Sequence, residues 1–411
     1  MYGTCFLAIA LVISQPDQAP DESPSPQPPA AAPAAAPASP VPPTPAPDRW
    51  LLMRSLQGTW PGWLLDSNRL QISGWTEVAM TGSTAANNQL PMGFNYRANE
   101  IQLQQNWVRF ERPVLTSGTT NPTFGFRSDW ILPGIDYRFT ISRGLFSGQL
   151  SADNGQPSLY GIDPVQFYGE AYFPTIGRGL DVKLGRMYCQ YGAETIDAVS
   201  NVLASHSYTF IYDPFTHTGI MGTQQLTLAW SVQLGVVMGP DVFFDAAASP
   251  YGMFSLKWAP PNGRNSILFS GLLGSGRFDV ANQFNNPNII DTVFIHTFNS
   301  RLTYTLDALG GYQTNVPNIG TATWWSTVHY LTWKFTPRLS GTTRLEFFDD
   351  IQGNRTGFAG LYAATTTGLN FQPRKSIVFR PEIRFDYNLD SRPFEDKHGL
   401  LTAAADLILR W

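Results

Sequence analysis

Residues 377–389 alternate between two kinds of side chain, and this pattern restricts the possible folds most strongly. The odd-numbered positions are apolar, whereas the even-numbered ones carry Arg380, Glu382, Arg384 and Asp386. Successive side chains of a β-strand point to opposite faces, so the segment is predicted to be a strand with one apolar and one charged face. In a soluble sandwich the apolar face would be core, and in a membrane barrel it would meet lipid.

Composition separates these two alternatives. Charged residues make up 14 % of the 411 residues, against roughly 25 % in ordinary soluble domains. Beyond the N-terminal stretch there is no run of about 18 apolar residues, which a membrane-spanning helix requires. Only helices and closed barrels satisfy all backbone polar groups in lipid, so the sequence favours an all-β transmembrane barrel over a soluble sandwich.

The chain from residue 70 onward consists of segments of about ten residues separated by Gly, Pro, Asn and Asp. We predict about 16 antiparallel strands, with 14 or 18 as alternatives. They cover 70–80, 100–111, 124–141, 164–173, 179–189, 208–221, 226–238, 250–259, 264–275, 291–299, 302–312, 322–335, 338–350, 356–371, 375–388 and 398–411. Short turns alternate with long loops, as in outer-membrane barrels.

The segment 124–141 requires a choice, because its apolar face switches at Pro133 and Gly134. Either a hairpin or a bulge could produce the switch. A hairpin would give an odd number of strands, whereas single-chain bacterial barrels have even numbers. We therefore expect one bulged strand.

The N-terminal region differs from the rest in composition. Residues 1–14 resemble a signal peptide, because 5–14 are apolar and small and polar residues follow. Residues 15–48 are mostly Pro, Ala and Ser, which predicts a disordered segment that is either a periplasmic tether or a featureless linker. In the entry segment 49–69, Asp48 is expected to cap a short helix at 50–56, which Pro61 ends. This helix is expected at the membrane surface or inside the barrel, and the barrel itself spans 70–411.

Charged side chains on the predicted inner face are candidate pore-lining residues. They are Asp136, Arg138, Arg344, Glu346, Arg380, Glu382, Arg384, Asp386, Asp406 and Arg410. Because acidic and basic groups are interleaved, they could set up a transverse field that orients polar solutes. Equally, they could form ion-pair ladders that brace the barrel.

The predicted loop 191–208 carries Glu194, Asp197, Asn201 and His206. It could fold inward and constrict a pore. Its length favours the alternative of an ordinary extracellular loop packed on its own side chains.

Enzymatic, metal and nucleic-acid functions find little support. The five histidines show no metal-ligand spacing. His206 has a serine on each side, but neighbours on a strand point to opposite faces and do not form a catalytic pair. No basic cluster indicates nucleic-acid binding. We therefore expect no catalytic residues, no metal and no cofactor.

Several motifs resemble the putative β-barrel porin-2 (OmpL-like) family. They are SGWTEVAMTGS at 73–83, GFRSDWILPGIDYRFT at 125–140, LYGIDPVQFYGEAYFP at 159–174 and GLDVKLGRMYCQYGAETI at 179–196. The resemblance covers about residues 70–411 and implies a bacterial outer-membrane barrel that conducts small hydrophilic solutes or ions. Trimeric porins suggest a homo-oligomer by analogy. The alternative is a structural or attachment barrel, plugged by 49–68, whose tether engages the cell wall.

The last predicted strand, 398–411, is apolar at every odd position from Leu401 to Trp411. An apolar strand that ends on an aromatic residue looks like the signal that bacterial barrel assembly machinery reads. Leu407, Leu409 and Trp411 are therefore the candidate assembly signal, with outer-membrane lipid around the finished barrel.

Overall fold

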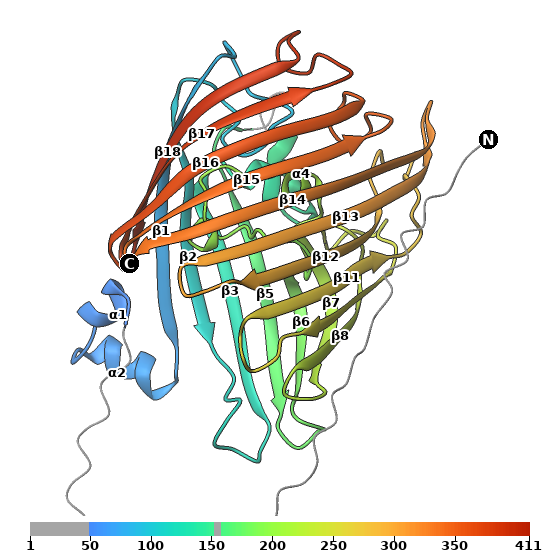
Figure 1. Cartoon of the computed structure of the whole chain (residues 1–411). Coiled ribbons are helices and arrows are strands. Elements are labelled where there is room, and N and C mark those ends of the chain that lie inside the picture. Colours follow the sequence, from blue (N-terminus) through green and yellow to red (C-terminus); the bar gives the residue numbers. More distant parts are fainter. Residues whose placement is uncertain (1–48, 152–157) are drawn as a thin grey trace, which may run out of the picture. The chain divides into compact units, whose positions relative to one another are not determined.

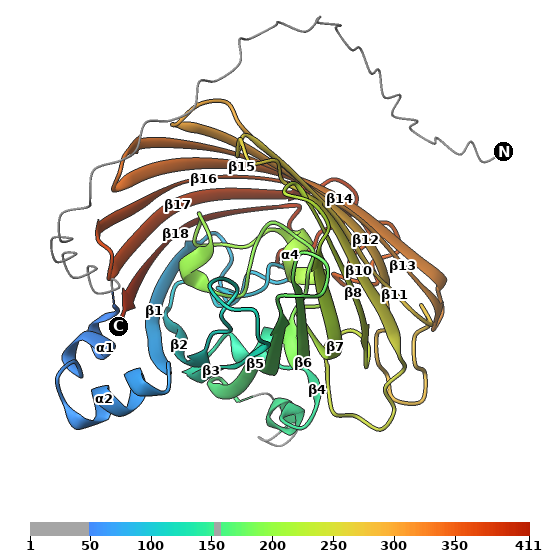
Figure 2. The same cartoon turned by 90° about the horizontal axis from the view of Figure 1, so that it is seen from below.

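The computed structural model describes residues 49–151 and 158–411. A closed barrel of 16 antiparallel strands forms its body (Figures 1 and 2). The strands are β1 (Gln71–Ser83), β2 (Ile101–Arg112), β3 (Thr123–Gly134), β5 (Gly161–Phe173), β6 (Leu180–Tyr188), β7 (Thr216–Gln225), β8 (Trp230–Val237), β10 (Tyr251–Trp258), β11 (Asn265–Leu273), β12 (Asn288–Thr297), β13 (Leu302–Val316), β14 (Gly320–Thr336), β15 (Leu339–Asp350), β16 (Gly360–Arg374), β17 (Ile377–Asn388) and β18 (Gly399–Arg410). The predicted architecture and strand number are confirmed.

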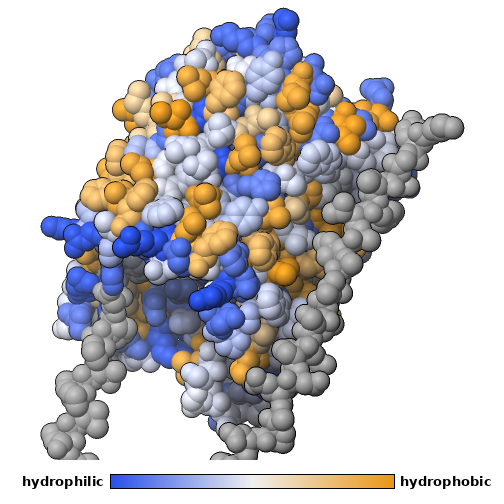
Figure 3. Space-filling model, in the orientation of Figure 1, coloured by the Kyte–Doolittle hydropathy of each residue, from blue (hydrophilic) through white to orange (hydrophobic). Residues whose placement is uncertain are grey.

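The alternation in sequence becomes an inside and an outside in the barrel wall. In β18, Leu401, Leu407 and Leu409 are exposed on the outer face, whereas Asp406 and Ile408 are buried inside. Figure 3 shows apolar side chains spread over the visible outer face of the barrel. An outer face of this kind suits hydrocarbon, and the charged residues of the same strands lie within.

The barrel closes where its first strand meets its last. Trp411, just beyond β18, exchanges two backbone hydrogen bonds with Gly74 of β1, at 2.9 and 3.0 Å. A Cβ atom on Gly74 would lie 2.1 Å from the Trp107 carbonyl oxygen and 2.5 Å from the Trp411 ring. The closing contact therefore requires glycine at position 74.

The connections differ in length at the two ends of the barrel. Two residues connect β14 to β15 and two connect β16 to β17, whereas long loops follow β1, β3, β6, β8 and β11 at the other end. The start of β1 and the end of β18 both lie at the short-turn end, as an even strand number requires.

Two predicted strands extend too far, because part of each enters the lumen. β3 ends at Gly134 and α3 (Tyr137–Thr140) follows, so 135–141 is not a bulged continuation of the wall. The predicted strand 208–221 likewise begins with α4 (Tyr208–Tyr212), which Ser207 caps by accepting a hydrogen bond from the Phe210 amide. The alternation of aromatic residues in 208–212 is typical of a strand, but their rings pack inside the barrel.

Smaller elements lie within the long loops. A two-residue strand, β4 (Arg143–Gly144), pairs in parallel with β9 (Val242–Phe243). The 3-10 turns η1 (Ser147–Ser151) and η2 (Ala198–Ser200) belong to the connections that follow β3 and β6. These pieces do not add strands to the barrel.

The entry segment forms two helices, α1 (Leu51–Ser55) and α2 (Trp60–Ser67). Pro61 does not simply end a helix but lies in the first turn of α2, where Thr59 accepts a hydrogen bond from the Gly62 amide. Figure 2 shows both helices outside the ring of strands, beside β1. The expectation that 49–68 plugs the lumen is therefore wrong.

The remaining N-terminal expectations fall on residues that the structure does not describe. Asp48, the signal-like segment 1–14 and the linker 15–48 all lie outside the described residues. Within 49–151 and 158–411, the helices are too short or too polar to cross a bilayer.

Candidate functional site

The lumen is crossed by the connection between β6 and β7, residues 189–215, here called the crossing segment. Its Gly192 and Ala193 amides donate to Asp291 of β12 (2.8 Å) and Asp307 of β13 (2.7 Å). Its Asp197 accepts from Arg109 of β2 at 3.0 Å. β2 and β13 lie far apart around the closed strand order. A single segment can reach both only by passing through the bore.

Glu194 is the central anchor of the crossing segment. One carboxylate oxygen accepts hydrogen bonds from Tyr330 (2.5 Å) and Arg344 (3.0 Å), and the other accepts from His206 (2.7 Å). Burial alone would raise the pKa of Glu194, but Arg344 and these hydrogen bonds outweigh it and lower the pKa to about 2. The group is therefore held as a carboxylate.

Asp197 ties the crossing segment to the opposite side of the barrel. It accepts from Arg109, which also pairs with Asp129 of β3 at 2.8 Å, and from the hydroxyl of Tyr188. Next to it, the Gln105 side chain donates to the Ile196 carbonyl at 2.8 Å. Three wall strands and the crossing segment thus share one polar cluster.

Asn201 and His206 shape the segment itself. The Asn201 side chain accepts from the Thr195 amide (3.0 Å) and donates to the Thr195 carbonyl (2.7 Å), which closes a local turn. The His206 ring packs against Phe210 and Phe94, with centroids 4.2 and 4.5 Å apart. The structure thus places the predicted loop inside the barrel, where sequence had favoured an external loop.

Most predicted lumen charges lie inside the barrel and pair with one another or with the crossing segment. Arg384 pairs with Asp386 (2.7 Å) and with Glu346 (3.1 Å). Arg380 pairs with Asp406 and donates to two carbonyls of the crossing segment. Glu382 accepts from the amides of residues 204 and 205. None of these charges is more than 6 % exposed, so the segment covers them.

Three predicted residues are placed differently. Asp136 is not on the third strand but in the turn behind it, where it accepts from Gln105 at 2.9 Å. Arg138 lies in α3, with its guanidinium carbon 5.1 Å from the centre of the Tyr96 ring. Arg410 lies at the rim, 4.1 Å above the ring of Trp50. The helical turn after Gly134 breaks the alternation from which the first two positions were predicted.

The sequence reasoning missed several buried ionic groups. Arg186 of β6 pairs with Asp163 of β5 at 2.5 Å, and both are essentially inaccessible. Asp291 and Asp307 anchor the crossing segment, yet each is the one charged residue of an otherwise neutral strand. A lone charge in the middle of an apolar strand was the signal that could have identified them.

Arginines on the inner face divide most of the inner wall into two parts. The arginine wall comprises β15–β18 and β1–β6, which contribute Arg344, Arg380, Arg384, Arg109 and Arg186. The acid wall comprises β8–β13, whose described residues include no arginine and whose buried charges are Asp291 and Asp307. The crossing segment packs mainly on the arginine wall.

Open space lies along the crossing segment as three adjoining cavities. One of about 310 Å³, at the short-turn end, is lined by residues 199–202 together with Lys334 and Arg338. The next, of about 90 Å³, shares residues 200–202 and is also lined by Glu194, Thr305 and Tyr330. The third, of about 210 Å³, shares Glu194 and reaches Leu268 of β11. The free space therefore lies toward β11, β13 and β14 in the two inner cavities, and against β14–β16 in the cavity at the short-turn end.

The site offers little for cofactor or covalent chemistry. Among the described residues, no three His, Cys, Asp or Glu side chains are arranged to hold a metal ion. Burial raises the pKa of the Cys189 thiol, which disfavours the reactive thiolate. Hydrogen bonding and packing are the roles that the geometry shows for these side chains.

Solved outer-membrane barrels share this architecture at low sequence identity. The DcaP channel of Acinetobacter baumannii has a TM-score of 0.54 and 11 % identity, covering 83 % of this chain and 97 % of that one. An anion-selective porin from Comamonas acidovorans gives 0.55 and 10 %, with 83 % and 99 % coverage. OmpT of Vibrio cholerae in its trimer form gives 0.53 and 8 %, with the same coverage. No curated protein matches the sequence.

The family assignment comes from the sequence as a whole. The family model described as "Putative beta-barrel porin-2, OmpL-like" matches residues 69–409, which include every strand of the barrel except the last residue of β18. The chain therefore belongs to this family, and it is a porin of the bacterial outer membrane.

Proposed function

We propose that the crossing segment is the constriction of this porin, and that small hydrophilic solutes or ions diffuse between it and the wall strands β11–β16. The observation that carries the proposal is the bonding of one segment to β2 and to β13, with three adjoining cavities along it. Of these three cavities the one between Glu194 and Thr305 is the smallest, at about 90 Å³, and we take it as the narrowest part of the route.

Charge along this route changes from one end to the other. Lys334 and Arg338 line the cavity at the short-turn end, whereas Glu194 lines the two cavities farther in. A charged solute therefore meets both signs, which favours weak and transient contacts over tight binding. No step requires a catalytic group, and the role we propose is passive diffusion.

Deletion of residues 195–204 tests the constriction. The deletion should raise single-channel conductance in planar bilayers at least about twofold, because it widens the bore at its narrowest point. A deletion of the exposed residues 116–121, in the turn between β2 and β3, is the matched control and should leave conductance unchanged. Heat-modifiable gel mobility confirms folding of both variants. Equal conductance of the two folded variants would contradict the proposal.

A structural or attachment barrel remains the rival function, and the crossing segment would be its plug. Folded wild-type protein that shows no discrete conductance steps would favour that rival. We also propose that the protein forms homo-oligomers, as the trimer form of the Vibrio cholerae neighbour illustrates for that protein. Mass measurement of the detergent complex tests this point separately.

We further propose that the C-terminal strand is the assembly signal. Leu407 and Leu409 face outward, and Trp411 bonds to β1. Replacement of Trp411 by Asp should lower the amount of protein in the outer membrane several-fold, whereas the conductance of the molecules that do assemble should stay the same. Normal outer-membrane levels of that variant would contradict the assignment.

A further inference from the structure

The short-turn end of the barrel is strongly basic. Its acidic side chains, counted to the same depth within the strands as the basic ones, are Asp66, Glu111 and Asp181. Its basic side chains are Arg49, Arg54, Arg69, Arg112, Arg178, Lys257, Arg264, Arg301, Lys334, Arg338, Arg374, Lys375 and Arg410. This end of the protein therefore presents a positive rim to the membrane surface around it.

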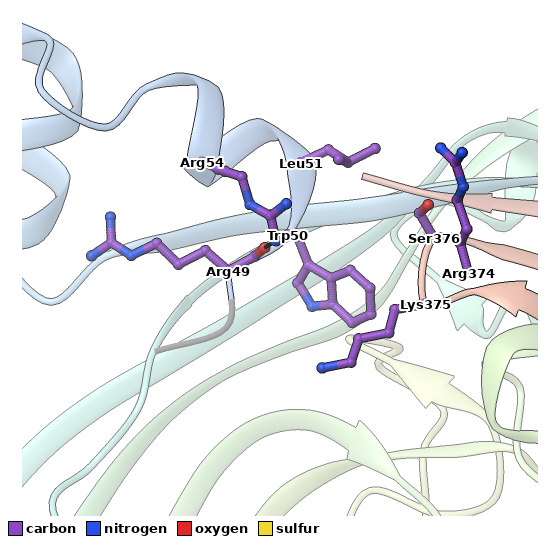
Figure 4. Close-up of a pocket in the computed structure, with 7 residues that line it drawn as sticks. All are labelled: Arg49, Trp50, Leu51, Arg54, Arg374, Lys375 and Ser376. Carbon is purple, nitrogen blue, oxygen red and sulfur yellow. Dashed lines mark hydrogen bonds between the residues drawn. The ribbon is translucent and has the colours of Figure 1, made fainter. Parts of the chain in front are cut away.

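A pocket of about 530 Å³ gathers the densest part of this charge (Figure 4). Its lining comes from two directions: Arg49, Trp50, Leu51 and Arg54 just before and within α1, and Arg374, Lys375 and Ser376 at the end of β16 and in the turn that follows it. The Arg49–Asp66 ion pair, at 2.7 Å, links the start of α1 to α2. Arg410 stacks on Trp50 and adds a further positive charge beside the pocket.

The helices next to this pocket expose large apolar side chains. Trp60 is 72 % exposed and Trp63 is 65 % exposed, and Leu51 and Leu64 are also exposed. In α2 only Gly62 is buried, so residues 49–151 and 158–411 leave most of this helix uncovered. Figure 2 shows α1 and α2 outside the ring of strands. Tryptophan and leucine beside arginine are typical of helices that lie in the membrane interface.

We propose that α1, α2 and the β16–β17 turn form a docking site for an anionic phospholipid of the adjoining leaflet. The phosphate binds in the pocket among Arg54, Arg374 and Lys375, and Trp60 and Trp63 insert at the boundary of headgroups and acyl chains. The four cationic side chains of the pocket complement an anionic headgroup. The apolar helix surface continues the lipid-facing wall, in which Phe371 and Leu409 are exposed close to the same rim.

A free anion in solution would explain the charge but not the exposed tryptophans. An anionic solute that passes through the pore would not explain the exposed tryptophans either, because α2 lies outside the bore. A phospholipid accounts for both features, since its phosphate and its acyl chains lie only a few ångströms apart. We therefore assign the lipid as the occupant.

Native mass spectrometry of the purified full-length barrel tests the headgroup. Phosphatidylglycerol should be retained more strongly than phosphatidylcholine, and the triple variant Arg54→Gln, Arg374→Gln, Lys375→Gln should lose this preference, by about fivefold per charge removed. The control variant Arg301→Gln, Lys334→Gln, Arg338→Gln removes three charges from the same end but outside the pocket, and should keep it. Equal losses in the two variants would show a diffuse charge effect and overturn the site.

Spin labels in nanodiscs test the insertion. With Cys5 and Cys189 replaced by Ser, a label on Trp63→Cys should be accessible to oxygen and protected from a water-soluble nickel complex in phosphatidylglycerol bilayers. A label on Gln57→Cys, in the exposed connection between the helices, should show the reverse. An aqueous label at position 63 overturns the proposal. So would inorganic phosphate that displaces phosphatidylglycerol at equal concentration, or burial of position 63 by a second copy in lipid-free detergent.

Discussion

The arginine wall and the acid wall of the lumen hold the crossing segment by different contacts. The arginine wall holds it with side chains: Arg344, Arg380 and Arg109 each reach the segment, and each also pairs with a carboxylate of the barrel wall. The acid wall holds it through Asp291 and Asp307, each of which accepts a hydrogen bond from one backbone amide of the segment. The two inner cavities extend toward β11, β13 and β14, and none of the three cavities is lined by Arg344, Arg380 or Arg109. The comparison suggests that the porin fixes its constriction on one side and leaves the other side open.

Arginine suits the fixed side because of its geometry. A planar guanidinium has five donors, so one residue can pair with a carboxylate and still satisfy backbone carbonyls. Arg344 does this with Glu194, the Ser205 carbonyl and the Ser205 hydroxyl. A buried carboxylate has no such surplus and depends on donors from elsewhere. Removal of one side chain should therefore cost more stability on the arginine wall than on the acid wall.

The replacement of Arg344 by Ala should give the largest effect. It removes four contacts to the segment and leaves Glu194 and Glu346 buried with less compensation. Loss of one partner of a buried ion pair costs about 3–5 kcal/mol. Urea unfolding of the refolded barrel in detergent measures this change. A loss below about 1 kcal/mol would show that the arginine wall is not the anchor.

Acid pH should weaken the anchor at Glu194, with an effect smaller than that of Arg344→Ala and larger than that of Asp307→Asn. The folded-state pKa of Glu194 is lowered from 4.5 to about 2, so its stabilising contribution is complete above about 4.5 and is lost as the pH falls toward 2. Because the carboxylate stays ionised in the folded barrel until the pH approaches about 2, the part of the conductance that depends on Glu194 should change only close to that pH, whereas the stability that Glu194 contributes should begin to fall below about pH 4.5. In Glu194→Gln this pH response should be absent between pH 5 and pH 2. An identical response in the variant would assign the titration to another group.

Replacement of Asp307 by Asn should give the smallest effect. Asn still offers an oxygen to the Ala193 amide, and within the part of the chain that the structure describes no arginine pairs with Asp307. We expect a change of less than about 1 kcal/mol in unfolding free energy, because one neutral hydrogen bond replaces a charged one. The same urea titration measures it. A loss as large as that of Arg344→Ala would remove the distinction between the walls.

How much could be predicted from the sequence depends on how local the determining contacts are. Alternation in 377–389 was sufficient to place Arg380, Glu382, Arg384 and Asp386 inside, because the strand period and the barrel face coincide. The inward course of 189–215 was not predictable in this way. Its anchors join Glu194 to Arg344, 150 residues away, and Asp197 to Arg109, 88 residues away. No local pattern encodes which distant strand will face a loop.

The misplaced strand ends have a related cause. Tyr208, Phe210 and Tyr212 alternate like a strand, but Ser207 caps a helical turn there and the rings find partners inside the barrel. The capping serine was the local signal that competed with the alternation. Tertiary packing decided between the two, as it commonly does for short segments.

The reciprocal bonding of Trp411 with Gly74 also bears on how the barrel forms in time. The first strand is made early, but its partner β18 lies more than 300 residues later in the chain. Contacts so distant in sequence form slowly, because the intervening chain must first be ordered. Until then β1 keeps an unpaired edge, and such edges invite pairing with other chains. Closure therefore depends on arrival of the complete chain, and a truncated chain would be left with an open and aggregation-prone edge.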